Sequence, residues 1–199
     1  MPRTASFVSC LSLLLLCWLG MQIVHELGHA VGALLTGGRV NTVFLHPLAI
    51  SRTDVHPNPA PGIVVWMGPL GGCCLPLFAL MLCRRLQKRH VATRANSICP
   101  RICGLVGFFA GFCLISNGAY LAFGTHDRVG DCGEMLRTGT PAWIICGTGI
   151  AMTVAGFYSW HHLGSLPRWF SSQDRSWNEA AMTSATLPLV VAVELWLTS

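Results

Sequence analysis

Residues 24–30 read Val-His-Glu-Leu-Gly-His-Ala and lie within an almost entirely apolar run from residue 7 to residue 35. This run exceeds the roughly 20 residues that a helix needs to cross the apolar part of a bilayer, so it predicts a membrane-spanning helix. His25 and His29 are four positions apart. On a helix such positions share one face, with Cβ atoms about 5–6 Å apart, so both imidazoles can reach one metal ion.

Glu26 follows the first histidine and completes the pattern His-Glu-x-x-His. On a helix, this pattern is typical of two histidines that bind zinc and a glutamate that acts as a general base toward water. The alternative to metal binding is that the two histidines have this spacing by chance and serve only as packed structural residues. Ionisable groups at membrane depth cost at least a few kcal/mol each and usually mark a functional site. The sequence therefore predicts Zn²⁺ on His25 and His29, with Glu26 as the catalytic base.

The composition is that of a multi-pass membrane protein. The 199 residues are 52% hydrophobic and 11% charged, whereas soluble domains carry about 25% charged residues. The chain has ten cysteines, and no two of them form a Cys-x-x-Cys pair. Most lie in apolar runs, so we expect them to pack as small apolar side chains. The net charge of +5 comes largely from one short basic segment, and we expect no nucleic-acid partner.

The apolar runs predict a single membrane-embedded, all-α domain over residues 1–199, with about five transmembrane helices. The expected spans are residues 7–35, 63–83, 102–123, 141–160 and, more weakly, 180–197. Glycines at positions 37 and 38 should end the first helix. Residues 39–51 favour extended structure and residues 54–61 form a proline-rich loop, which predicts a small interfacial β element after the first span.

Residues 68–72 of the second span read Gly-Pro-Leu-Gly-Gly. Proline and paired glycines interrupt helices, and within a membrane such a break must lie against protein or water. Close packing of helices through small residues is the alternative. The sequence leaves both roles open: lining a site and packing against a neighbouring helix.

The segment 84–101 has the highest concentration of positive charge in the chain. By the positive-inside rule, this segment is predicted to be a cytoplasmic loop. It holds six basic residues and no acidic residue, namely Arg84, Arg85, Lys88, Arg89, Arg94 and Arg101.

A catalytic zinc ion usually has three protein ligands, so one more is needed. The first and third spans run in the same direction, so the end of the third span returns to the side of the two histidines. The acidic residues found there are Asp127, Asp131 and Glu134. We favour Asp131, because the flanking glycines allow close approach of the backbone. Asp131 and Glu134 also have the spacing of a capping box, so a helix cap is the alternative role.

Taken in order, the motifs of this chain resemble those of the site-2 protease family of intramembrane zinc metalloproteases, in particular its compact bacterial-type branch. The matching segments are residues 25–30, 36–40, 45–48 and 68–72, followed by Asn117 and Gly130-Asp131. The resemblance implies three core spans, zinc on His25, His29 and Asp131, and activation of water by Glu26. It also implies that Asn117 lies near the substrate backbone or the oxyanion.

The resemblance implies a zinc-dependent endopeptidase that hydrolyses a peptide bond in or near a transmembrane segment of a membrane-protein substrate. This is the reaction of regulated intramembrane proteolysis, and the expected partners are that substrate and the lipid bilayer. Two alternatives remain: a non-catalytic membrane scaffold of the same fold, and a metal transporter whose histidines line a path. A transporter predicts further polar residues in the later spans, and the second and fourth spans have almost none.

Overall fold

The computed structural model describes residues 2–47, 51–91, 98–163 and 184–192. The described part of the chain is mostly helical, as the sequence predicts, and residues 184–192 are helical as well. The elements follow one another as α1 (Pro2–Leu35), β1 (Val40–Phe44), β2 (Arg52–Val55), α2 (Pro61–Val91), α3 (Ile98–Gly124), α4 (Gly130–Arg137) and α5 (Ala142–His162).

Four helices of the described residues are long and apolar enough to cross a membrane, which makes the chain a multi-pass integral membrane protein. These candidate spans match the first four predicted spans closely. They are Phe7–Leu35, Pro61–Lys88, Ile102–Gly124 and Ala142–His162. The fifth predicted span, 180–197, falls partly outside the described residues. Within its described portion the Ser184 hydroxyl lies 3.0 Å from the Ser12 hydroxyl on α1.

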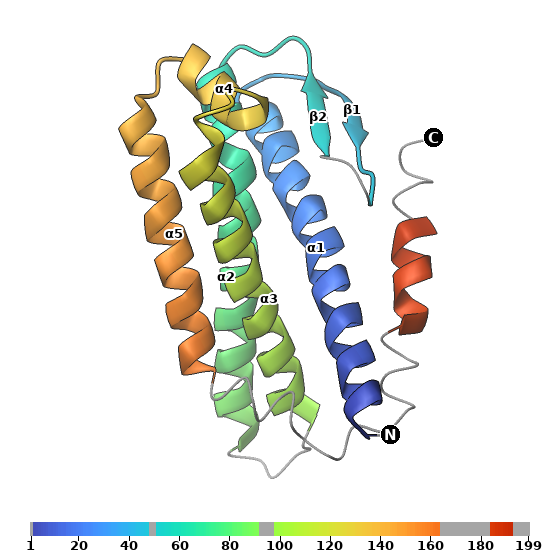
Figure 1. Cartoon of the computed structure of the whole chain (residues 1–199). Helices are drawn as coiled ribbons and strands as arrows, with labels where there is room; N and C mark the ends of the chain where they lie inside the picture. Colours follow the sequence, from blue (N-terminus) through green and yellow to red (C-terminus); the bar gives the residue numbers. More distant parts are fainter. Residues whose placement is uncertain (1, 48–50, 92–97, 164–183, 193–199) are drawn as a thin grey trace.

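The long helices form a bundle in which α2 packs against both α1 and α3, and α5 packs along α3 (Figure 1). The chain rises in α1, descends in α2 and rises again in α3, so α1 and α3 end on the same side of the bundle (Figure 1). The short helix α4 and the two strands also lie at this end (Figure 1). The predicted return of the segment after the third span to the histidine motif is therefore confirmed.

The predicted β element is an antiparallel hairpin in which Val40 pairs with Val55 and Phe44 pairs with Arg52. Gly37 has a φ of +78°, and the Gly38 N–H donates to a carbonyl of the last turn of α1 at 2.8 Å, so the glycines end the helix as predicted. The second strand lies further along the chain than predicted, because it includes residues assigned to the proline-rich loop. Pairing with β1 decides strand formation here, since β propensity depends strongly on context.

Helix α2 is continuous through residues 68–72, so the predicted interruption is wrong. Pro69 lies inside the helix, and in a membrane neighbouring helices compensate for the backbone groups that a proline leaves unbonded. The glycines instead permit close packing. A Cβ on Gly28 would collide with the Met67 carbonyl, and a Cβ on Gly71 would lie 2.9 Å from the Gly28 Cα. The packing role predicted for this segment is confirmed.

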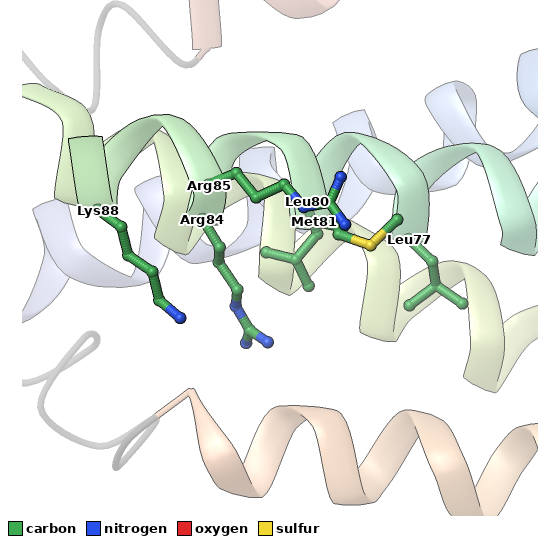
Figure 2. A pocket seen from close by; sticks show the side chains of 6 residues that line it. All are labelled: Leu77, Leu80, Met81, Arg84, Arg85 and Lys88. Carbon is green, nitrogen blue, oxygen red and sulfur yellow. The ribbon is translucent and has the colours of Figure 1, made fainter. Parts of the chain in front are cut away.

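The far end of α2 carries the basic side chains. The helix continues to Val91, so Arg84, Arg85 and Lys88 are helical and the predicted loop 84–101 is much shorter than expected. These three residues line a pocket of about 340 Å³ together with apolar residues of the same helix, namely Leu77, Leu80 and Met81 (Figure 2). This end lies opposite α4 and the hairpin (Figure 1). Its cytoplasmic location stays a prediction, and residues 92–97 lie outside the described part.

Gly28→Ala should destabilise the protein by about 1–3 kcal/mol, because the new methyl group must displace α2 at Met67. Thermal unfolding in detergent measures this effect. Gly147→Ala is the matched control, because no atom lies within 4 Å of its Cβ position. It should leave stability unchanged or raise it by up to about 1 kcal/mol. Equal stability of the two variants would contradict the close contact between α1 and α2.

Candidate metal centre

Three side chains converge at the end of the bundle. His25 and His29 of α1 and Asp131 of α4 each offer one ligand atom, and these atoms lie within 4.8 Å of one another. Asp131 Oδ2 is 2.8 Å from His25 Nε2 and 3.4 Å from His29 Nε2, and the two Nε2 atoms are 3.1 Å apart. No other group of three or more His, Cys, Asp or Glu side chains converges in this way among the described residues.

The three potential ligand atoms are spaced nearly as a zinc ion requires. Bonds of about 2.0–2.1 Å in a tetrahedron place neighbouring ligand atoms roughly 3.3–3.4 Å apart, close to the separations observed between His25, His29 and Asp131. Three nitrogen and oxygen ligands with an open fourth position are typical of catalytic zinc, whereas structural zinc has four protein ligands. The donor set therefore fits a catalytic zinc ion.

The second nitrogen of each imidazole has its own partner. His25 Nδ1 donates to Asn117 Oδ1 at 2.7 Å, and His29 Nδ1 donates to the Val64 carbonyl at 2.9 Å. Asn117 Nδ2 donates to a carbonyl of its own helix at 3.0 Å, which fixes the orientation of the amide. With the proton on Nδ1, each Nε2 keeps its lone pair for a metal. The sequence predicted Asn117 near the substrate. In the structure it contacts His25 through Nδ1, the nitrogen that does not face the proposed metal.

Gly68 leaves room for both imidazoles. A Cβ at this position would collide with the His29 ring and lie 2.9 Å from His25 Nε2, and a Cβ on Gly72 would lie 3.2 Å from the His25 Cα. The segment 68–72 therefore lines the site as well as packing against α1. Both roles that the sequence left open are confirmed.

Asp131 reaches the histidines from the first turn of α4. Gly130, just before it, has a φ of +62°, and a Cβ there would collide with the Tyr120 hydroxyl, so the predicted need for glycine is confirmed. The Asp131 N–H donates to that hydroxyl at 2.9 Å. The N-terminal cap of α4 is Val129, and no side chain caps the helix, so the predicted cap role of Asp131 is wrong.

Electrostatics favour the ionised form of Asp131. Burial alone would raise its pKa, but the close contacts of its carboxylate with His25 and His29 hold the pKa well below its ordinary value. Burial raises the pKa of the neighbouring Cys132 to about 11, so this thiol stays neutral and packs with the core. Among the described residues, the cluster therefore offers a metal one carboxylate and no thiolate.

The other acidic candidates in this segment lie outside the cluster. Glu134 accepts hydrogen bonds from Arg137, at 2.9 Å from its Nε, and Asp127 is exposed. Neither belongs to the converging group.

Glu26 is held by the hairpin rather than by the metal ligands. It is 2% exposed. Its Oε1 accepts a hydrogen bond from the Ser51 hydroxyl and its Oε2 from the Thr53 hydroxyl, both at 2.6 Å. Sequence reasoning missed these two partners. Their alternate spacing places both hydroxyls on one face of an extended chain, which is the signal that a search for partners of Glu26 would have used.

A family model described as Peptidase M50B-like matches residues 5–123, more than half of the chain. No curated protein and no solved structure matches the chain. The match includes the histidine motif, the hairpin, residues 68–72 and Asn117, but it ends before Asp131, whose assignment therefore rests on geometry. The resemblance to a site-2 protease-like family is confirmed, and the chain belongs to the Peptidase M50B-like family.

Proposed function

We propose that the protein is a zinc-dependent intramembrane endopeptidase that hydrolyses a peptide bond in or near a transmembrane segment of another membrane protein. The observation that carries this proposal is the convergence of His25, His29 and Asp131 beside Glu26 at one end of an apolar bundle. Family membership supports a membrane metalloprotease type of function. The position of the motif on a candidate membrane span supports a transmembrane substrate.

In this mechanism His25, His29 and Asp131 hold the zinc ion. When bound, zinc lowers the pKa of a coordinated water to about 7 and polarises the carbonyl of the substrate. Glu26 takes a proton from the attacking water and passes it to the leaving amine.

Two groups of side chains position these residues. The Ser51 and Thr53 hydroxyls each donate to one oxygen of the Glu26 carboxylate, so each oxygen keeps a further lone pair for water. Asn117 orients the His25 ring through Nδ1.

The alternatives find less support in the structure. A transporter needs polar side chains along a path through the membrane. The buried polar side chains of the described residues lie on α1, apart from Asn117 on α3, and none lies on α2 or α5. A non-catalytic scaffold does not require the observed arrangement, in which both Nδ1 atoms are hydrogen-bonded and both Nε2 atoms face the Asp131 carboxylate.

His29→Ala and Asp131→Ala should each lose the zinc that elemental analysis finds on the purified protein, because each removes one of three ligands. Asp127→Ala, an exposed change in the same segment, is the control and should keep it. Retention of zinc by Asp131→Ala would refute the ligand set.

Glu26→Gln should keep zinc and slow cleavage by about 10²–10⁴-fold, because it removes the general base. The probe is a single-span membrane protein with a Gly-Pro break in its apolar segment, reconstituted in liposomes and analysed by mass spectrometry. Cleavage at the wild-type rate by Glu26→Gln would refute the protease proposal. Zinc transport by the variant would favour the transporter.

Asn117→Leu should weaken zinc binding by about 10–100-fold, because the proton on His25 Nδ1 loses its acceptor. Asn117→Asp keeps an acceptor at the same place and should restore binding. Competition with a chelator measures both affinities. Equal affinity of Asn117→Leu and wild type would show that the amide does not orient the ligand.

The double change Ser51→Ala, Thr53→Val should lower kcat by about tenfold or more with KM and bound zinc unchanged, because Glu26 loses both positioning hydroxyls. Thr53→Ser keeps a hydroxyl and should keep kcat. Thr42→Val removes an exposed hydroxyl from β1 and is the control. A rise in kcat of the double variant would mean that the hairpin restrains Glu26 instead of positioning it.

A further inference from the structure

Gln22 is a buried amide without a partner. It is 3% exposed, and neither its Nε2 nor its Oε1 has a hydrogen-bond partner among the residues that the structure describes. The one other buried side-chain atom in this condition, within the same residues, is Asn58 Oδ1 in the loop before α2. Burying a polar group without a hydrogen bond is costly, and the apolar part of a bilayer supplies no water to compensate. An unpaired amide at this depth therefore needs a reason.

Gln22 lies on the face of α1 that carries the proposed site. It precedes His25 by three residues and Glu26 by four, and such positions are neighbours on a helix. One turn rises about 5.4 Å. An extended peptide advances about 3.3 Å per residue, so a chain that passes Glu26 along this face reaches Gln22 about two residues away from the reacting bond.

Toward the N-terminus of α1, the side chains on the same face become exposed on the surface of the protein. Leu11, Leu15 and Trp18 continue it at spacings of three or four residues, and they are 47%, 44% and 39% exposed. Trp18 Nε1 donates to the Pro47 carbonyl at 3.4 Å, so the chain after β1 reaches α1 one turn before Gln22. The hairpin stands beside the half of α1 that carries the motif (Figure 1). Gln22 therefore lies where the exposed apolar side chains on this face of α1 give way to buried ones.

We propose that Gln22 binds the main chain of the substrate, with Nε2 donating to a carbonyl and Oε1 accepting from an N–H about two residues from the cleaved bond. This rests on the proposed function. A carboxamide offers a donor and an acceptor side by side, and so pairs with a peptide group of any sequence. A helix bonds these groups internally and offers neither. The occupant is thus the locally unwound part of an apolar transmembrane segment whose helical part lies along Leu11, Leu15 and Trp18.

The first test measures stability and does not depend on cleavage. Gln22→Met replaces the unpaired amide by an apolar side chain of similar length. It should raise the Tm of the zinc-loaded protein in detergent by about 2–4 °C, because a buried unsatisfied group is removed. Leu19→Met, a buried change on the same helix, controls for methionine itself and should not raise the Tm. A lower Tm for Gln22→Met would overturn the proposal, because it would reveal a structural partner.

The second test measures binding in the Glu26→Gln background, so that the probe stays intact. The probe is a labelled synthetic peptide of about 20 apolar residues with a Gly-Pro break near one end, in phosphatidylcholine liposomes, and energy transfer reports binding. A peptide of the same composition without the break is the control. Gln22→Met should weaken binding of the broken peptide by about threefold to tenfold and leave the unbroken peptide unaffected.

Unchanged binding of the broken peptide by Gln22→Met would overturn the proposal, as would an equal loss of binding for both peptides. The proposal would also fail if the Glu26→Gln protein with Gln22 intact bound the broken and unbroken peptides equally well. Because binding is read without hydrolysis, an absence of peptidase activity in the wild type would refute the proposed function and leave the result on Gln22 intact.

Discussion

Burying charged and polar side chains in a membrane bundle is costly unless their polar atoms find partners, and the partners of His25, His29 and Glu26 organise one end of the molecule. His25 uses Asn117 of α3, His29 uses the Val64 carbonyl of α2, and both meet Asp131 of α4. Glu26 uses two hydroxyls of the segment that forms β2. The helices α2, α3 and α4 and the segment that forms β2 thus each contribute at least one partner to the site.

Glycine makes this arrangement geometrically possible. The imidazoles fit beside α2 because residue 68 has no side chain, and α1 approaches α2 closely because residues 28 and 71 have none. Association of helices in lipid relies on close packing and hydrogen bonds, since the lipid chains are as apolar as the side chains. The close contact between α1 and α2 therefore also leaves the room that the two imidazoles need.

The sequence predicted what depends on local spacing and on chain direction. The histidine pair follows from helix geometry, and the choice of Asp131 follows from the parallel course of α1 and α3 with a glycine beside the acid. The sequence did not predict the continuity of α2 through Pro69, because neighbouring helices decide whether a membrane helix tolerates proline. It also missed Ser51 and Thr53 as partners of Glu26, because contacts between separate elements have no fixed spacing along the chain.

The two histidines of the proposed metal site are synthesised long before the third ligand. Asp131 lies 106 residues after His25, on a helix that forms only after the third span has been made. A ribosome-bound chain that has inserted α1 and α2 holds the two histidines and the base, but it lacks the anionic ligand and the Asn117 that orients an imidazole. On the proposed mechanism such a nascent chain is hydrolytically inert, and competence to cut other membrane proteins arrives together with completion of the bundle.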